Sequence, residues 1–297
     1  MITIDPKEIK TGQFHAHMLS AVAPRPIAFA STIDNEGHPN LSPYSFFNAF
    51  GSKPPTLIFS PARRVRDNTI KHTLENVYAN MEVVINTVTY SMVQQASLSS
   101  CEYPKGVSEF VKAGFTPEPS VLVKPFRVKE SPVQFECKVK QVIETGTEGG
   151  AGNLVICEIL LMHINEEVMG ADGKIDQHKI DLVARCGYDW YCRASGNALF
   201  EVAKPNLKLG IGIDSIPATI RLSSILSGND LGQLGNVEAL PSKEEILAFG
   251  EIEEIRKLKA VLKEDATHAE TARHMAAKEL IRTGNVTDAW KLLLMEL

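Results

Sequence analysis

Up to about residue 190, short runs of apolar residues alternate with polar positions and turn signals. These runs predict strands at 25–33, 56–60, 82–88, 132–144 and 153–165. Within QFECKVKQVIE the alternation places Phe135, Cys137, Val139 and Val142 on the inward face. The glycine-rich stretch 146–152 joins the last two strands as a hairpin loop, and short helical patterns occur at about 66–78 and 91–98. Long strands with few helices between them favour a closed antiparallel barrel.

The pattern changes after residue 192. Residues 193–240 are rich in Gly, Ser, Asn and Pro, as connecting segments are, although Pro217 could open a short helix. From residue 241 apolar residues recur at helical spacing, and Ser242 with Glu245 forms a capping-box pattern. We therefore expect a β-rich domain at 1–192, a connecting segment at 193–240 and an α-helical extension at 241–297. The apolar faces of the extension must be buried internally or against a second subunit.

Composition narrows the class of protein. The 297 residues are 44% hydrophobic and 23% charged, as in an ordinary globular protein. A net charge of -5 disfavours nonspecific nucleic-acid binding, which needs a basic surface. The five cysteines lack a CxxC spacing, so reduced thiols are expected instead of a disulfide framework or zinc site. No apolar run approaches the roughly 20 residues of a membrane span, and the N-terminus lacks a signal-peptide layout. We expect a cytoplasmic protein.

Familiar catalytic motifs are missing from the sequence. It has no GxSxG elbow, and GIGID at 210–214 has too few glycines for a dinucleotide fingerprint. His15 and His17 are two residues apart, but no third ligand is evident nearby, so we expect no metal site. The motifs therefore assign no catalytic residue.

One constellation stands out, and it begins with NLSPYSFFNAF at 40–50. That segment is too polar for a buried strand and too aromatic for a plain loop. Cationic and hydroxyl groups follow it closely in the chain, at Arg63, Arg64, Arg66, Lys71 and Thr73. Backbone N–H groups, hydroxyls and cations together suit anion binding, and aromatic side chains suit a flat heterocycle. The cluster predicts a site for a phosphorylated aromatic cofactor. The alternative is a barrel rim with aromatics in the core and arginines in solvent.

The stretch RPIAFASTIDNEGHPNLSPYSFFNAFGSKPPTLIFSP at 25–61 resembles the flavin reductase-like family. These are FMN-binding split-barrel proteins that include the reductase components of two-component monooxygenases. The residues that carry the first family motif are Gly37, Asn40, Leu41, Ser42, Pro43, Ser45 and Phe46. A later Lys-Asp-Thr motif reads Lys71, His72 and Thr73, so His72 replaces the Asp. The strand at 158–168 and the closing segment at 182–191 extend the resemblance over about residues 10–192.

The resemblance implies a mainly β protein, an FMN-binding split β-barrel with short flanking helices and the C-terminal helical extension. It also implies a homodimer with FMN near the subunit interface, NADH or NADPH as electron donor and a possible partner oxygenase. Lys71 and Thr73 are the expected phosphate ligands, and the backbone of 42–48 would follow the isoalloxazine ring. His163, in the last barrel strand, would reach the flavin or nicotinamide, or else serve in the core. The cofactor-binding residues expected in all are Arg25, Asn40, Ser42, Pro43, Tyr44, Ser45, Phe46, Phe47, Asn48, Arg64, Lys71, Thr73, His163 and Arg185.

Three functions remain open from the sequence. The leading hypothesis is an NAD(P)H-dependent flavin oxidoreductase, in which hydride passes from nicotinamide to FMN. The second is a flavoprotein that carries electrons without using nicotinamide. The third is a flavin-binding interaction module whose helical extension recognises a partner. A further hypothesis places that extension across the cofactor site of a neighbouring subunit.

Overall fold

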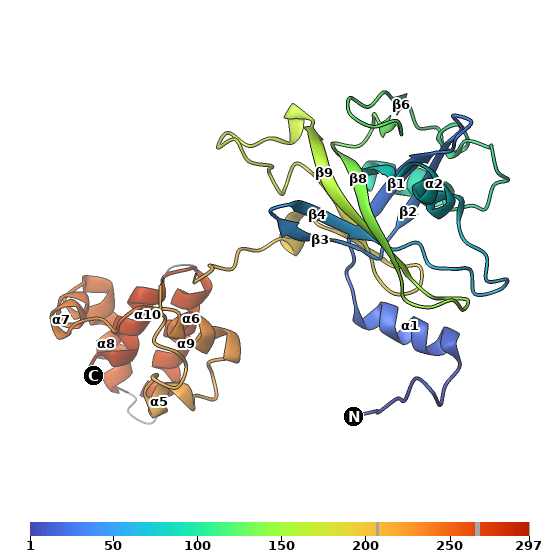
Figure 1. Cartoon of the computed structure of the whole chain (residues 1–297). Coiled ribbons are helices and arrows are strands. Elements are labelled where there is room, and N and C mark those ends of the chain that lie inside the picture. The colour runs from blue at the N-terminus through green and yellow to red at the C-terminus, as the bar shows by residue number, and fades with distance from the viewer. Residues whose placement is uncertain (206–207, 265–267, 297) are drawn as a thin grey trace. The chain divides into compact units, whose positions relative to one another are not determined.

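The computed structural model describes residues 1–205, 208–264 and 268–296. The chain divides into two compact units, residues 1–200 and 201–297 (Figure 1). Among the described residues, every helix is too short or too polar to cross a membrane.

The first unit is built on a seven-stranded antiparallel sheet with the order β2-β1-β5-β8-β9-β4-β3. The bounds of its strands are β1 Ala28–Ile33, β2 Pro39–Tyr44, β3 Phe47–Ser52, β4 Pro55–Phe59, β5 Glu82–Asn86, β8 Val133–Glu144 and β9 Asn153–Ile164. Two small sheets accompany it, formed by β6 Pro117–Glu118 with β7 Arg127–Val128 and by β10 Val183–Arg185 with β11 Tyr191–Arg193. The first unit is therefore mainly β, as predicted.

Alternation along the strands creates two main cores in this unit, beside a small cluster of Val133, Val168 and Ile180. Cys137 and Val139 are buried in the main core, and Phe135 and Val142 pack against it, which confirms the inward face predicted for β8. β1 is buried on both faces, because Ala28 and Ala30 belong to the main core while Phe29 lies in a second core. That second core lies beneath the helices α3 Val93–Leu98 and α4 Glu109–Ala113.

The remaining helices of the first unit are α1 Thr11–Ala21 and α2 His72–Asn80. The sequence predicted a helix from about residue 66, but α2 begins at His72. Asp67 accounts for the difference, because its carboxylate accepts hydrogen bonds from the backbone N–H (3.0 Å) and hydroxyl (2.6 Å) of Thr69. Asn68 adopts a left-handed conformation with φ of 57°. Such local side-chain bonds form a turn in place of a helix.

The second unit is a helical bundle with its own core. Its helices are α5 Ala218–Arg221, α6 Gly228–Gly235, α7 Lys243–Gly250, α8 Glu253–Glu264, α9 Ala269–Arg282 and α10 Val286–Leu294. Ser242 and Glu245 form the predicted capping box at the start of α7. Trp290 is fully buried, and its indole N–H donates to the carbonyl of Leu234 (3.0 Å). The segment 193–240 is more than a connection, since α5 and α6 contribute Ile220 and Leu234 to this core.

Candidate functional site

Residues 40–50 close the barrel, because they run from one edge of the sheet to the other. β2 and β3 are the two edge strands, yet only Ser45 and Phe46 separate them in sequence. In a flat seven-stranded sheet these edges would lie roughly 29 Å apart, whereas the link from Tyr44 to Phe47 spans about 11 Å at most. The sheet therefore has to curl until its edges meet. A hydrogen bond from the Ser60 N–H to the Phe46 carbonyl (2.9 Å) fixes this corner.

A cation-lined depression lies beside the first half of this segment, and we call it the basic pocket. β2, the loop before α2, the start of α2 and the segment after α3 all contribute to it. Its lining residues are Asn40, Ser42, Tyr44, Arg64, Lys71, His72, Thr73, Ser99, Ser100, Cys101, Glu102, Tyr103 and Glu109. The first N–H groups of α2 also lie here, and a helix N-terminus attracts anions. The pocket therefore combines cations, hydroxyls and a helix end.

Two cations of the pocket differ in how they are held. Lys71 is half-buried with its Nζ 5.8 Å from the centre of the Tyr44 ring, and burial, reinforced by repulsion from Arg64, lowers the pKa of its ammonium group. Arg64 is held more firmly. Its Nε donates to the Glu102 carboxylate (2.8 Å), and its Nη1 donates to the Thr69 hydroxyl (2.9 Å) and the Ile70 carbonyl (2.6 Å).

Glu102 is the counter-ion of this end of the pocket, and it also contacts Arg66. Hydrogen bonds from Arg64 and then Arg66 lower the pKa of its carboxyl group. The pocket is a shallow depression open to solvent, with about 30 Å³ of space beside these side chains. A phosphate group at Arg64 would compete with the Glu102 carboxylate.

A buried chain of hydrogen bonds supports the pocket from below. The Tyr44 hydroxyl donates to the Thr73 hydroxyl (2.9 Å), which donates to the Asn40 side-chain carbonyl (3.2 Å). The Asn40 amide and the Leu41 N–H then donate to the carboxylate of Glu109 (3.2 and 3.0 Å). Burial raises the pKa of both Glu109 and Tyr44. Thr73 is 1% exposed, so its hydroxyl positions its neighbours.

A second hollow, the central cavity, begins where the basic pocket ends. It has a volume of about 380 Å³ and is lined by Gly12, His15, Ala16, Leu19, Arg25, Ile27, Pro43, Ser45, Ser97, Ser100, Arg185, Tyr188 and Tyr191. Ser100 lines both hollows. The volume falls within the usual range of small-molecule sites, about 300–1,000 Å³. The central cavity is therefore large enough for a flat ring system next to the cationic groups of the basic pocket.

Arg25 ties the walls of the central cavity together. It is 6% exposed, and its guanidinium donates to the carbonyls of Leu19 and Val22 (2.5 Å each) and of Cys186 (2.9 Å). These bonds connect α1 and the segment after β10 to the barrel. Burial, and then repulsion from Arg185, lowers the pKa of Arg25. With its donors used in this way, Arg25 is suited to positioning the walls.

Arg185 lines the central cavity next to Arg25. Its Nη1 donates to the Tyr191 hydroxyl (2.6 Å), its Nη2 donates to the Tyr188 carbonyl (2.5 Å), and it stacks 4.7 Å from the centre of the Tyr191 ring. Two backbone hydrogen bonds of 2.8 Å join it to Arg25. The two arginines that the sequence placed 160 positions apart thus meet at one site.

Four of the sequence-predicted residues lie elsewhere or act differently. His163 contacts Glu136 (2.8 Å), whose carboxylate also accepts from the N–H groups of Val121 and Leu122. Burial alone would raise the pKa of Glu136, but these hydrogen bonds outweigh burial and lower it. Phe47 and Asn48 line an apolar cavity of about 240 Å³ that shares Ile27 with the central cavity. Phe46 makes an edge-on contact with His15 of α1, with ring centres 6.2 Å apart.

The other predicted residues divide between the two hollows. Asn40, Ser42, Tyr44, Arg64, Lys71 and Thr73 line the basic pocket, and Arg25, Pro43, Ser45 and Arg185 line the central cavity. Sequence reasoning missed the serines that follow α3, Glu102, Glu109 and the tyrosines near Arg185. The run SLSS at 97–100 gave little signal, because it ends a helix and the hydroxyls of Ser99 and Ser100 donate to the carbonyls of Ala96 and Ser97.

Comparison with known proteins identifies the family. Residues 19–178, more than half of the chain, match the family described as flavin reductase like domain. An uncharacterised protein of Aquifex aeolicus is 34% identical over 196 residues, covering 66% of this chain and 97% of the relative. The chain therefore belongs to the flavin reductase-like family, and its seven-stranded sheet is the split barrel of that family. The match ends at residue 178, so it concerns the first unit.

Solved structures give the same picture. Nitrilotriacetate monooxygenase component B from Bacillus cereus is 26% identical with a TM-score of 0.64, covering 68% of this chain and 98% of that one. A protein of Shewanella frigidimarina assigned as a flavin reductase with a split barrel domain is 27% identical, with a TM-score of 0.58, covering 69% and 100%. These similarities support an oxidoreductase that works with flavin.

Proposed function

We propose that the first unit binds FMN and reduces it with NADH or NADPH, so that hydride passes from the nicotinamide to the flavin. The observation that carries this proposal is the continuity of the basic pocket and the central cavity at the corner that closes the barrel. One end offers cations and hydroxyls for a phosphate, and the other offers space for a three-ring system. Membership of the flavin reductase-like family supports the same reading.

The residues of the basic pocket fit the phosphate of FMN. Lys71 supplies an ammonium group, Arg64 supplies a guanidinium, and Ser42 supplies a hydroxyl on the same wall. Charge-assisted hydrogen bonds of this kind are the strong ones in phosphate recognition. The buried hydrogen-bond chain of Thr73, Asn40 and Glu109 fixes the position of α2 relative to β2. They are positioning residues in this proposal.

The residues of the central cavity fit the ring. Pro43 and Ser45 present the end of β2 along one side, while α1 and the segment after β10 form the others. When bound, FMN supplies the hydride-accepting chemistry. The chain's part is to align the donor with the ring, to exclude water and to hold polar groups at the edge of the ring where negative charge develops. A dedicated acid or base is unnecessary for hydride delivery, so the catalytic residues stay unassigned.

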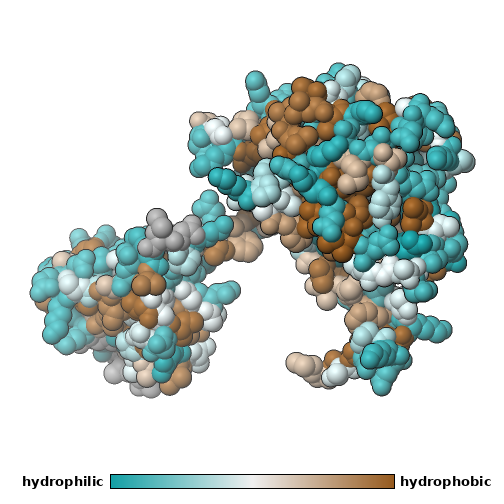
Figure 2. All heavy atoms as spheres, in the orientation of Figure 1, coloured by the Kyte–Doolittle hydropathy of each residue, from teal (hydrophilic) through white to brown (hydrophobic). Residues whose placement is uncertain are grey.

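We further propose that the protein acts as a homodimer. Leu160, Met162 and Ile164 lie at alternate positions of β9, so they share one face of the strand, and each is 37–42% exposed. Phe50 of β3 is 63% exposed. Apolar patches are visible on the first unit in Figure 2. A second copy would cover this face, and a Met162→Glu variant that stays dimeric by light scattering would contradict this proposal.

The comparisons also suggest a partner oxygenase, because the B. cereus neighbour is named as component B of a monooxygenase. We propose that reduced flavin made here is used by a second protein. This proposal predicts that hydroxylation by a flavin-dependent oxygenase in the same reaction depends on added NAD(P)H and on this protein.

The test of the proposed function uses the purified full chain. Its visible spectrum is recorded with added FMN, and NADH or NADPH is then added without oxygen. Loss of the flavin absorption band supports the reductase. Bound FMN that stays oxidised with both donors favours the electron carrier or the binding module. Failure to bind FMN or to oxidise either donor refutes the proposal.

A further inference from the structure

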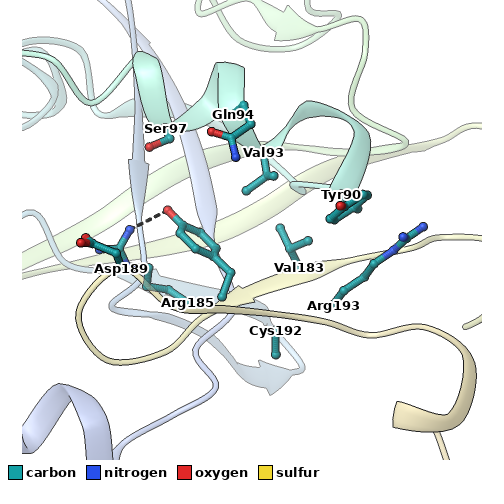
Figure 3. Close-up of a pocket in the computed structure, with 10 residues that line it drawn as sticks. Tyr90, Val93, Gln94, Ser97, Val183, Arg185, Asp189, Cys192 and Arg193 are labelled. Carbon is teal, nitrogen blue, oxygen red and sulfur yellow. Dashed lines mark hydrogen bonds and ion pairs between the residues drawn. The ribbon is translucent and has the colours of Figure 1, made fainter.

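Another hollow adjoins the central cavity, and the proposed FMN site does not use it. This hairpin cavity has a volume of about 390 Å³ and lies between α3 and the β10–β11 hairpin (Figure 3). Its lining residues are Tyr90, Val93, Gln94, Ser97, Val183, Arg185, Asp189, Tyr191, Cys192 and Arg193. Arg185 with Asp189 and Arg193 with Tyr90 lie toward opposite ends in Figure 3, with Val93 and Val183 between them.

The hairpin cavity and the central cavity share three lining residues, Ser97, Arg185 and Tyr191. A single long molecule could therefore place one part in each. Arg185 lies where the two cavities adjoin, since it lines both of them. Its guanidinium donates to the Tyr191 hydroxyl and the Tyr188 carbonyl. A guanidinium has five N–H donors, so these two bonds leave donors for a ligand.

The far end of the hairpin cavity combines a cation with a flat aromatic surface. The Arg193 guanidinium lies 4.0 Å from the centre of the Tyr90 ring. The Asp181 carboxylate accepts from its Nε and Nη2 (2.7 and 2.8 Å), which holds it in place and leaves Nη1 for a ligand. Tyr90 is 53% exposed. Such stacked pairs of Arg and Tyr recognise planar bases and anions.

The lining offers guanidinium donors but no large excess of positive charge. Asp181 pairs with Arg193 (2.7 Å), and Asp189, whose side chain is fully in solvent, lies 3.8 Å from Arg185. Gln94 and Ser97 of α3 add neutral hydrogen-bonding groups. The guanidinium donors that remain, together with the Tyr90 ring, suit a ligand that carries both an anionic group and an aromatic ring.

We propose that the hairpin cavity binds the adenosine diphosphate part of the nicotinamide donor. This inference rests on the proposed function, because hydride transfer requires the nicotinamide to lie against the flavin in the central cavity at about 3–3.5 Å. The rest of the donor is a pyrophosphate and an adenine, which need cations and a stacking surface within one molecule's length. Arg185 donates hydrogen bonds to the pyrophosphate where the two cavities adjoin, and the adenine stacks at the Tyr90–Arg193 pair.

The first experiment measures binding of ADP to the full chain by titration calorimetry, in the presence of FMN. We expect ADP to bind, and Tyr90→Leu to weaken its binding by at least about fivefold, since stacking of a base on an aromatic side chain contributes about 1–3 kcal/mol. Tyr90→Phe keeps the ring and should stay within about twofold of wild type. Tyr78→Leu is the matched control, because Tyr78 is 45% exposed and lies on α2, where it donates to Glu144.

The second experiment compares NADH and NADPH with 1-benzyl-1,4-dihydronicotinamide, a donor that lacks the adenosine diphosphate part. We expect Tyr90→Leu and Arg193→Lys to raise the ratio of the KM for the intact donor to the KM for the truncated donor. Competition by ADP should be seen only against the intact donor. Competition by benzoate with no effect of ADP would overturn the proposal and point to an aromatic acid instead.

The outcomes separate this inference from the proposed function. If the wild type oxidises both donors but ADP fails to bind, or binds Tyr90→Leu as tightly as wild type, the hairpin cavity is not the ADP site and the reductase stands. If the wild type oxidises neither donor, the proposed function fails. In that case ADP binding that depends on Tyr90 would still support an adenine nucleotide site, and its absence would refute one.

Discussion

Replacing Lys71 by Met tests the assignment of the basic pocket most directly. Methionine is similar in length and apolar, so it fills the half-buried position beside the Tyr44 ring while removing the positive charge. The buried hydrogen-bond chain through Tyr44 and Thr73 does not involve the Lys71 ammonium group, so it should persist. The variant therefore removes one charge from the pocket with little change to its walls.

The expected loss follows from the kind of contact. A hydrogen bond between a charged donor and a phosphate contributes about 1.5–3 kcal/mol, which corresponds to a roughly 10- to 150-fold weaker FMN affinity. Arg64 remains in the variant, so binding should be weakened and not abolished. Riboflavin has the same ring but no phosphate, and its affinity should change by less than about twofold.

The assay is fluorescence titration of the full chain with FMN and with riboflavin, for wild type, Lys71→Met and Lys140→Met. Lys140 is a surface lysine that pairs with Glu158 (3.0 Å) on the strands, so it serves as the matched control. Because burial and then Arg64 lower the pKa of Lys71, the preference for FMN over riboflavin should also fall at a lower pH than for an ordinary lysine. An unchanged ratio of the two affinities in Lys71→Met would refute the assignment.

Three further changes have defined outcomes. Glu102→Gln removes the carboxylate that competes for Arg64, so FMN should bind roughly two- to fivefold more tightly in titration; weaker binding would show that Glu102 supports the pocket. Burial raises the pKa of Glu109 above its ordinary 4.5, so the folded protein keeps this proton to a higher pH than the unfolded chain does. Stability therefore falls as pH rises from the pKa of the unfolded state to that of the folded state. Glu109→Gln should remove this fall in calorimetric melting scans at pH 4–8, and an unchanged slope would contradict it. Trp290→Ala should destabilise the second unit by about 3–5 kcal/mol in denaturant titrations and leave FMN affinity unchanged; a loss of FMN affinity would show that the units are coupled.

Local patterns in the sequence predicted much of the framework. The alternation in 132–144 places Cys137 and Val139 in the core as expected, and Ser242 with Glu245 begins a helix as expected. These features depend on residues that are only a few positions apart in the chain, and such interactions can be seen in the sequence itself. The family resemblance added the split barrel, which the family match and the structural neighbours confirm.

Interactions between distant segments could not be predicted in the same way. The sequence showed Arg25 as a cation near the site, but its partners are the carbonyls of Leu19, Val22 and Cys186. Thr73 likewise looked like a phosphate ligand, although its hydroxyl lies inside a hydrogen-bond chain ending at Glu109. Burial and carbonyl partners decide both roles, and both arise only when the chain is folded. The assignment of the cofactor ligands stays a prediction.

The two-residue corner at Ser45 and Phe46 also has a consequence for how the protein assembles. β2 pairs with β1 nearby in sequence, but β4 and β3 join the sheet only when β4 pairs with β9, for example Thr56 with Glu158. Contacts of such large sequence separation form slowly, because the loop entropy is lost before they are made. The walls of the proposed FMN site should therefore meet late in folding. FMN would then bind only the completed barrel. Supply of FMN should therefore raise the yield of folded protein during synthesis.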